Sequence, residues 1–300
     1  MAARKSTSRK SAPRKSAPRK SAARTIAFQG HPGAYSHLAC VQYFPEMEPL
    51  PTSAFEDTFE AVRTGKARLA MIPIDNSVAG RVADIHHILP ESGLFIVGER
   101  FLRVNHHLLA PRGATLKTLK EVHSHVHALG QCRKFLRANG LKAVVHADTA
   151  GAAADIAAWD DPSKAAIASS LAGDVYGLKS IRASIEDAEH NTTRFVIMAK
   201  KPVRPKRDNG PLVTSFVFRV RNVPAALFKA LGGFATNGVN MTKLESYMVG
   251  GDFVATQFYA DIEGDPRDRN VELAMDELRF FTHEVRILGT YPADPFRFRK

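Results

Sequence analysis

The sequence predicts an α/β protein with two folded domains, and three observations support this. Between residues 25 and 199, short runs of β-forming residues alternate with helical patterns, which is typical of helices layered on a largely parallel sheet. Residues 212–288 follow the order strand, helix, strand, strand, helix, strand, which is the ferredoxin-like plan. Residues 200–211 combine charge, prolines and Asn-Gly, which is the composition of a linker.

The first domain is predicted to alternate six strands with helices. The predicted strands are residues 25–28, 68–72, 94–97, 143–146, 165–168 and 194–199. One helix begins at a capping box formed by Ser53 and Glu56 and ends near Gly65. A second covers residues 128–138 and ends at Asn139-Gly140, and a third covers residues 150–159.

The second domain is predicted to hold four strands and two helices. The strands are residues 212–220, 239–249, 253–262 and 284–288, and the helices are residues 224–236 and 267–281. The turn Gly250-Gly251-Asp252 joins the two middle strands as a hairpin.

The net charge of +12 would first suggest a nucleic-acid or acidic-membrane partner. Residues 1–24, however, contain nine Lys/Arg and no acid, so the rest of the chain carries only +3. This tail repeats Arg-Lys-Ser every five residues and can bury nothing apolar, which predicts a disordered, solvated extension or a start codon placed too early. A tail that binds nucleic acid is the alternative, and a transit peptide would need an amphipathic stripe that the tail lacks.

Other protein classes are excluded by composition. No apolar run reaches the roughly 18–20 residues of a membrane span, and the N-terminus lacks the apolar core of a secretory signal. Cys40 and Cys132 are too few for a disulfide framework and form no metal-type pair. We therefore expect a cytoplasmic protein with reduced thiols.

Two polar segments follow strands of the first domain, where ligands bind in open α/β sheets. In Gln29–Ser36, Gly30 and Gly33 would let the backbone approach an anion, although a simple tight turn is equally consistent. In residues 72–77, an apolar strand ends in Asp75, Asn76 and Ser77, for which an Asx turn is the structural alternative.

A third polar segment contains His123, His125 and His127. Two-residue spacing would place three imidazoles on one strand face, as in a metal site, but the segment turns into a helix near Ala128 and offers no carboxylate or Cys at ligand spacing. We therefore predict no metal. Ser124 and Gln131 are the more plausible ligand-binding side chains here.

The fourth segment, residues 190–195, places Thr192 and Thr193 beside Arg194 at the start of an apolar strand. Two hydroxyls and a guanidinium suit a carboxylate, whereas the structural alternative is a strand-entry turn with an exposed Arg. The sequence contains no Gly-x-Ser-x-Gly elbow, Walker loop or dinucleotide fingerprint. A pocket of hydroxyls, amides and Arg needs no cofactor.

These four segments, in this order, resemble the prephenate dehydratases of phenylalanine biosynthesis over residues 25–300. Gly30-x-x-Gly33-x-Tyr35-Ser36 resembles the family's Gly-x-x-Gly-x-Tyr-Ser, and Asn191-x-Thr193-Arg194-Phe195 resembles its Asn-x-Thr-Arg-Phe signature. Residues 72–77 resemble Pro-Ile-Glu-Asn-Ser, with Asp75 in place of Glu. Residues 124–132 resemble Ser-His-Pro-Gln…Gln-Cys but depart from it at positions 126 and 127.

The resemblance implies a domain of two lobes at residues 25–203, similar to type II periplasmic binding proteins, with the active site between the lobes. After a linker at 204–211, residues 212–300 would form an ACT domain that binds phenylalanine as a feedback inhibitor at a dimer interface. Its signature is incomplete, because Ala225 replaces Gly and the Arg-Pro after Ser246 is missing. The implied effector residues are Ala225, Ala226, Leu227, Asn240, Glu245 and Ser246. A homodimer or homotetramer is expected through this domain, with a ligand-free dimerisation module as the alternative.

The family's reaction converts prephenate to phenylpyruvate, carbon dioxide and water. The resemblance implies that Thr193 is the catalytic donor to the departing hydroxyl. We expect Asn76, Ser77, Ser124 and Gln131 to surround the ring and Arg194 to hold the pyruvyl carboxylate, with Thr192 and Ser36 as further binding residues. The alternatives are an arogenate dehydratase or a carboxylate-binding sensor without enzymatic activity.

Overall fold

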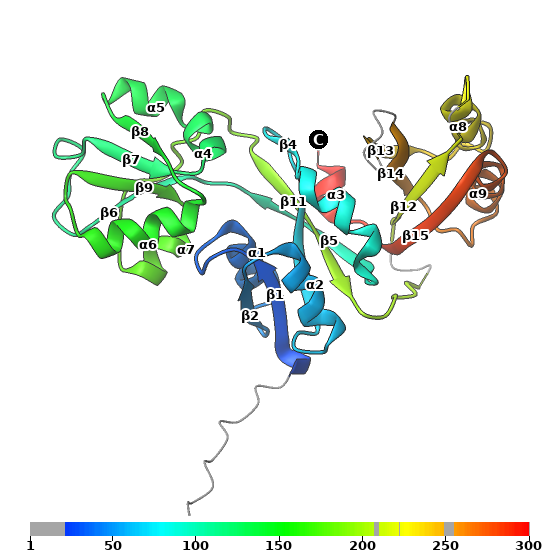
Figure 1. Cartoon of the computed structure of the whole chain (residues 1–300), viewed down its shortest axis with the longest axis horizontal. Coiled ribbons are helices and arrows are strands. Elements are labelled where there is room, and N and C mark those ends of the chain that lie inside the picture. The colour runs from blue at the N-terminus through cyan, green and yellow to red at the C-terminus, as the bar shows by residue number, and fades with distance from the viewer. Residues whose placement is uncertain (1–21, 207–209, 222, 249–254, 300) are drawn as a thin grey trace, which may run out of the picture.

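The computed structural model describes residues 22–206, 210–221, 223–248 and 255–299. Three sheets organise the chain (Figure 1). Two of them form the lobes of a catalytic-type domain, and the third forms a C-terminal domain. The basic repeat of the tail and the turn at residues 250–252 lie outside the described residues. Within the described part of the chain, no helix has the length and apolarity needed to cross a membrane.

The first lobe is built on a six-stranded sheet in the order β2-β1-β3-β11-β5, with β4 beside β3. Its strands are β1 (Thr25–Gln29), β2 (Glu48–Thr52), β3 (Leu69–Asn76), β4 (Gly80–Arg81), β5 (Phe95–Arg103) and β11 (Thr192–Ala199). Helix α1 (Tyr35–Tyr43) packs on one face. Helices α2 (Phe55–Arg63) and α3 (Ala83–Ile88) pack on the other face.

The second lobe is inserted between β5 and β11. Its sheet has the order β10-β6-β9-β7-β8. The strands are β6 (His107–Ala110), β7 (Glu121–Ser124), β8 (Lys142–Val145), β9 (Lys164–Ala168) and β10 (Lys179–Arg182). The helices are α4 (Val126–Gln131), α5 (Arg133–Ala138), α6 (Thr149–Trp159) and α7 (Ser170–Tyr176). The chain therefore crosses twice between lobes, after β5 and before β11, and a pocket lined by both lobes lies between them.

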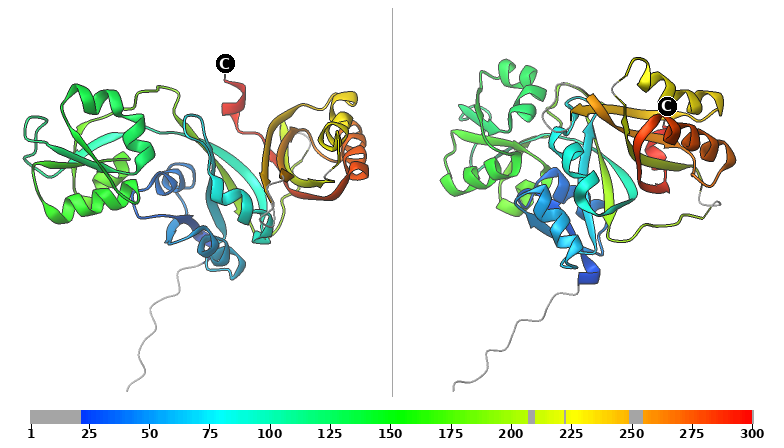
Figure 2. Two further views of the ribbon diagram at one scale, coloured as in Figure 1. Left: turned by 45° about the horizontal axis from the view of Figure 1, so that its top comes forward. Right: turned by 45° about the vertical axis from the view of Figure 1, so that its right-hand side comes forward.

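The C-terminal domain has the predicted βαββαβ order. It comprises β12 (Leu212–Val220), α8 (Ala226–Thr236), β13 (Met241–Met248), β14 (Ala255–Glu263), α9 (Arg269–Phe281) and β15 (Thr282–Pro292), with sheet order β13-β14-β12-β15. Short 3-10 helices cover Ala22–Arg24, Pro90–Ser92 and Pro295–Phe298. Helices α8 and α9 cover one face of this sheet, while the other face packs on the first lobe (Figure 2).

Three local expectations were wrong. The sheets are mixed rather than largely parallel, because β11 returns from the second lobe and runs antiparallel to both β3 and β5. The capping box does not form, since α2 is preceded by Ala54 without a side-chain cap. The helix predicted at 128–138 is two helices separated at Cys132, whose backbone N–H bonds to the carbonyl of Leu129.

Strand β15 approaches β5 so closely that only glycine fits at position 289. A Cβ on Gly289 would overlap the carbonyl group of Ile96. The two strands belong to different domains, so this backbone contact fixes how the C-terminal domain sits on the first lobe.

We expect Gly289→Ala to destabilise the docked arrangement by about 1–3 kcal/mol, because rigid backbone would have to move apart. Differential scanning calorimetry should show a lower Tm, and the linker should be cleaved faster by protease. The matched control is Gly232→Ala in α8, where a Cβ meets no atom within 4 Å and should leave the Tm unchanged or raise it. Equal Tm values for both variants would show that the close approach of β15 to β5 does not affect the stability of the protein.

Candidate active site

A pocket of about 270 Å³ lies in the cleft between the two lobes. The first lobe contributes Asn76 at the end of β3 and Thr193 at the start of β11. The second lobe contributes His125, His127 and Gln131 from around α4. Tyr35, Ala79, Val104, His106, Ala128, Asp148 and Thr149 complete the lining. Residues from six separate parts of the sequence therefore meet at one site.

The orientation of the Asn76 amide decides what Thr193 can do. Its Oδ1 accepts hydrogen bonds from the backbone N–H groups of Val78 and Ala79 at 3.0 and 2.7 Å. Its Nδ2 is therefore the donor to the hydroxyl oxygen of Thr193, at 3.0 Å. The Thr193 hydroxyl thus accepts from Asn76, which leaves its own proton to be donated into the cleft.

A directed hydrogen-bond chain extends from this pair across the cleft. Asn76 also donates to Asn191 Oδ1 at 2.8 Å, and Asn191 Nδ2 donates to Gln131 Oε1 at 3.0 Å. The same Gln131 oxygen lies 2.8 Å from His106 Nε2, and His106 Nδ1 lies 2.7 Å from the hydroxyl of Tyr35. Since Gln131 Oε1 can only accept, His106 carries its proton on Nε2 and its Nδ1 accepts from Tyr35.

Burial sets the charge states along this chain. Desolvation lowers the pKa of His106 below its ordinary value, although the hydrogen bond to Gln131 opposes this shift. Burial also raises the pKa of Tyr35 well above its ordinary value, so that the phenol stays protonated. At neutral pH the chain is therefore uncharged, and the one Tyr35 proton is shared between His106 Nδ1 and the carbonyl of Asn105, which lies 3.0 Å from the hydroxyl.

We expect acidification to disrupt this chain. The folded-state pKa of His106 is below its unfolded-state pKa of about 6.5. The unfolded state consequently binds the proton first, and stability falls as the pH drops below that value. Protonation of Nδ1 would also reverse the hydrogen bond with the Tyr35 hydroxyl and place a positive charge at the pocket, so kcat should decline on the acid side. A His106→Asn variant should lose that acid limb, and an identical pH profile for kcat in the variant would contradict the assignment.

Four other predicted binding residues lie outside the pocket lining. Ser124 is fully buried and its hydroxyl bonds to the carbonyl of Ile167 at 2.6 Å, so the expected contact with substrate is wrong. Ser77 donates to the carbonyl of His190 and accepts from the N–H of Thr192, which fastens the β3 turn to β11. Thr192 and Ser36 are buried.

Arg194 does not face the cleft, and the expectation that it holds a substrate carboxylate is wrong. Successive side chains of a strand point to opposite faces. Thr193 pairs with Asn76 on the cleft side, and the next cross-strand pair, Arg194 with Asp75, lies on the side of the C-terminal domain. The Arg194 side chain is only 7% exposed there.

Arg194 is the centre of a buried ionic network between the two domains. Its Nε donates to Glu99 Oε2 at 2.8 Å, and its terminal nitrogens reach Asp261 Oδ2 at 2.5 Å and the Tyr291 hydroxyl at 3.1 Å. Arg297 also binds both oxygens of Glu99, at 2.5 and 2.9 Å. Asp261 and Tyr291 belong to β14 and β15 of the C-terminal domain, so this network joins strand β11, which carries Thr193, to that domain.

In this network, the attraction between opposite charges has a larger effect on the pKa values than removal of the groups from water. Burial alone would lower the pKa of Arg194, but Asp261, Tyr291, Tyr259 and Glu99 raise it well above its ordinary value. Burial alone would raise the pKa of Asp261, but Arg194 and a hydrogen bond from Ser215 lower it. Both groups are therefore charged at neutral pH.

Strand β13 makes a second set of contacts around Asn76. Lys243 Nζ lies 2.7 Å from Asp75 Oδ1, directly before Asn76 in the chain. Arg81 of β4 donates to the carbonyl of Ser246 at 2.9 Å and lies 3.8 Å from the carboxylate of Glu245. The C-terminal domain therefore holds the residues on both sides of the turn that carries Asn76.

Among the predicted effector residues, Asn240 is separated from the others by the length of α8. The helix begins after Ala225, whose φ of 60° is left-handed, where a glycine would be unstrained. Asn240 follows the far end of the helix and is exposed. Eleven helical residues span about 16 Å. Ala226 and Leu227 begin the helix. Glu245 and Ser246 of β13 are level with the last part of β12, since Ser246 and Phe218 both pair with Phe258, and so lie toward the Ala225 end of α8.

The three clustered histidines do not share one site. The His123 ring packs edge-on against Trp159 at 5.1 Å, whereas His125 and His127 lie at the pocket with their rings 5.0 Å apart. Within the described ranges, no three His, Cys, Asp or Glu residues are grouped to hold a metal ion. Burial raises the pKa of the thiols of Cys40 and Cys132, which disfavours a thiolate nucleophile at either position.

Comparison with known proteins identifies the family. A family model described as prephenate dehydratase matches residues 26–203, which is more than half of the chain. The chain belongs to the prephenate dehydratase family. The match covers both lobes and both members of the Asn76–Thr193 pair.

Similar proteins extend over nearly the whole chain. A bifunctional N-acyl-homoserine lactone acylase/prephenate dehydratase from Komagataeibacter europaeus is 51% identical, over 91% of this chain and 98% of the relative. Arogenate dehydratase/prephenate dehydratase 1 of Arabidopsis thaliana is 37% identical, over 91% of this chain and 73% of the relative. The structure of a prephenate dehydratase from Arthrobacter aurescens in complex with L-Phe is 30% identical, with a TM-score of 0.81, and covers 89% of each chain.

These matches establish the predicted enzyme class and architecture. The chain is a prephenate dehydratase of the family, with a catalytic domain of two lobes and an additional βαββαβ domain.

Proposed function

We propose that this chain converts prephenate to phenylpyruvate, carbon dioxide and water, with Thr193 as the proton donor. The observation that carries the proposal is the 3.0 Å hydrogen bond from Asn76 Nδ2 to the Thr193 oxygen. Because that oxygen already accepts from Asn76, its proton is directed away, toward a ligand in the cleft. A positioned donor of this kind stabilises charge where it develops in the transition state.

The reaction requires little more from the protein. The bond between the ring and its carboxylate breaks and releases carbon dioxide, and its electron pair completes the aromatic ring as the carbon–oxygen bond to the ring hydroxyl breaks. Thr193 donates its proton to that departing oxygen, forming water, and is then reprotonated by solvent. Because aromatisation supplies the driving force, the barrier lies in expelling a poor leaving group.

Because Arg194 is bonded to Glu99 and Asp261 at the domain interface, another group has to bind the substrate's pyruvyl carboxylate. We assign this role to the second lobe. His125 and His127 line the pocket on the side opposite Thr193. The N–H of His127 reaches His125 Nδ1 at 3.4 Å, which leaves His125 Nε2 as a donor. We infer that both imidazoles donate hydrogen bonds to this carboxylate, while the departing carboxylate meets only uncharged groups.

We expect the double variant His125→Ala/His127→Ala to raise the KM for prephenate at least tenfold, since each lost bond to a charged group costs about 1.5 kcal/mol or more. The kcat should change little, because these contacts are equal in the ground and transition states. Val126→Ala, between the two histidines and 53% exposed, is the matched control. An unchanged KM in the double variant would remove both residues from the binding site.

Prephenate is favoured over arogenate, which carries an ammonium group in place of the keto oxygen. Such a group needs a free carboxylate in the cleft. Among the described lining residues only Asp148 is acidic. It already caps α6 through the N–H of Gly151 at 2.7 Å and pairs with His31 at 3.0 Å.

The test is a comparison of kcat/KM for the two substrates on the same preparation. We expect prephenate to be preferred at least tenfold, with phenylpyruvate as its product. A preference for arogenate would identify the chain as an arogenate dehydratase. If neither compound is turned over while both bind, the chain is a carboxylate sensor.

We further propose that phenylalanine inhibits the enzyme by binding between two copies of the C-terminal domain. Asn240 and Ala225 are separated by the length of α8, about 16 Å, so one chain does not surround a small ligand with both. Edge strand β13, with Leu244 and Met248 exposed, is the surface on which a second copy would bring them together. Analytical ultracentrifugation with and without phenylalanine, beside the inhibition curve, tests this. A monomer that is still inhibited would refute it.

A further inference from the structure

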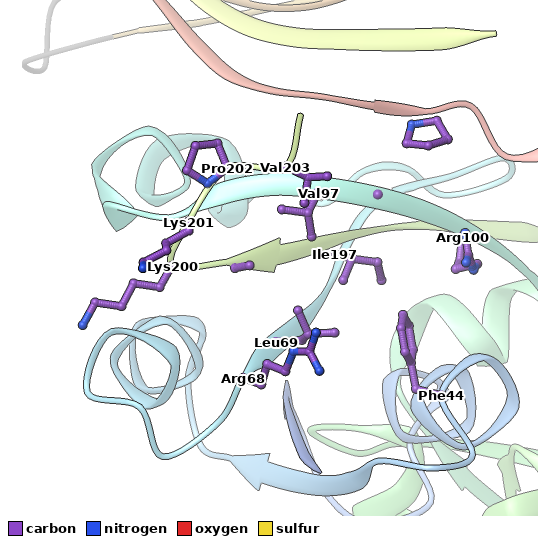
Figure 3. A pocket seen from close by; sticks show the side chains of 13 residues that line it. Phe44, Arg68, Leu69, Val97, Arg100, Ile197, Lys200, Lys201, Pro202 and Val203 are labelled. Carbon is purple, nitrogen blue, oxygen red and sulfur yellow. The ribbon is translucent and has the colours of Figure 1, made fainter. Parts of the chain in front are cut away.

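A second cavity, of about 710 Å³, lies on the face of the first lobe's sheet opposite the one on which the C-terminal domain packs. Figure 3 shows the side chains that line it. Its floor is the α1-covered face of the sheet, at the end of β11 near Ile197 and Ala199. Thr193 lies about 13 Å or more away along the same strand, at roughly 3.3 Å per residue. The cavity is therefore separate from the catalytic cleft.

The cavity exists because α1 is too short to cover the whole face. The helix ends at Tyr43, and Phe44 forms one wall. Leu69, Val97 and Ile197 form an apolar floor. The linker contributes Pro202 and Val203, and Pro292 at the end of β15 closes the far side.

The charges around this apolar floor are all positive. Arg68, Arg100, Lys200 and Lys201 line the cavity, and none of the thirteen lining residues is acidic. Two of these cations are engaged elsewhere, since Lys200 donates to the carbonyl of Arg63 at 2.9 Å and Arg100 lies 3.6 Å from Asp294. Arg68 is exposed, and no hydrogen bond or ion pair joins its side chain to another described residue. Its guanidinium is therefore available to a ligand.

We propose that this cavity binds a small amphipathic carboxylate, whose aryl or alkyl body rests on the apolar floor and whose carboxylate pairs with Arg68. The planar guanidinium matches a carboxylate in a bidentate geometry. The volume is within the range of sites for small organic ligands, and mostly apolar walls with a few placed charges are typical of such sites. A bare inorganic anion would leave the floor unused.

Such a ligand would contact both domains and the linker that joins them. Since it binds the docked arrangement, it should stabilise that arrangement by mass action. The expected consequence is a ligand-dependent rise in Tm and slower proteolysis of the linker.

The proposal is tested by isothermal titration calorimetry of the full chain with two carboxylates. 3-Phenylpropionate has an aryl body and octanoate has an alkyl body, so the comparison shows which kind of ligand the cavity prefers. We expect one site per chain for at least one of them. The corresponding amides should not bind, because they lack the charge. Arg68→Gln should weaken binding at least tenfold, whereas Lys66→Gln, which removes a neighbouring exposed charge outside the cavity lining, should leave it within twofold.

A second variant separates the cavity from the catalytic cleft. The Cβ of a residue at position 98 would meet only Ile197, at 3.8 Å, and Gly98 does not have a positive φ. Gly98→Val should therefore fold, reduce the cavity and abolish binding, while prephenate turnover continues. Binding that persists in both Arg68→Gln and Gly98→Val, or no binding of either carboxylate to the parent chain, would overturn the proposal.

Discussion

Replacing Thr193 with alanine is expected to lower kcat by roughly 10²–10⁴-fold, which is the usual contribution of a positioned proton donor. The KM should change little, because the hydroxyl bonds to the departing oxygen only as charge develops. The variant would also leave Asn76 Nδ2 with one acceptor, Asn191, so the fold of the turn should survive. Steady-state kinetics with prephenate measure both constants.

The matched control is Thr193→Ser, which keeps the hydroxyl and removes only a methyl group. It should retain most of the activity. Circular dichroism and Tm of both variants show whether the strand is intact. If Thr193→Ala retained near-full kcat, the proton would have to come from another group.

Replacing Asp261 with asparagine should have the second-largest effect, although the residue is remote from the substrate. It leaves Arg194 and Arg297 to share the buried Glu99 carboxylate, so the network lacks one buried negative charge, which costs about 3–5 kcal/mol. Arg194 follows Thr193 directly, so a shift of this strand should also misplace the donor. We expect a lower Tm and, well below that Tm, a kcat reduced roughly ten- to a hundredfold.

The control for this prediction is Asp276→Asn on α9. Its ion pair with Arg279 is exposed and has a similar distance, 2.8 Å, so its loss should cost less than about 1 kcal/mol and leave kcat unchanged. A lower Tm with unchanged kcat in Asp261→Asn would show that the network stabilises the domains without positioning Thr193.

The same ion pair makes the stability of the fold depend on pH. Because the folded-state pKa of Asp261 is depressed, its contribution to stability is lost as the pH falls through that pKa.

Local patterns predicted most of the elements, because each depends on nearby residues. The βαββαβ order and the strands that became β1, β9, β12 and β14 follow from apolar runs bounded by turn residues. Strand β2 was missed because its five residues contain Pro49 and Pro51. Prolines are tolerated there because β2 is at the edge of its sheet.

The site was predicted in part for a physical reason. Asn76, Gln131 and Thr193 come together because the end of β3, the short helix α4 and the start of β11 converge on the cleft. Arg194 was misplaced although the alternation of side chains on a strand was available as a signal: neighbours such as Thr193 and Arg194 cannot both face one pocket. Its true partners, Glu99 and Asp261, are 95 and 67 residues away in the sequence, and no local pattern reveals such pairs.

The most direct test of the central claim is the product balance of the full chain acting on prephenate. Carbon dioxide and phenylpyruvate should be released in equal amounts by the parent protein. Under the same conditions, Thr193→Ala should release both at a rate reduced by the same factor, since one concerted loss forms them. Carbon dioxide released without phenylpyruvate, or no release above the uncatalysed rate, would contradict the proposed reaction.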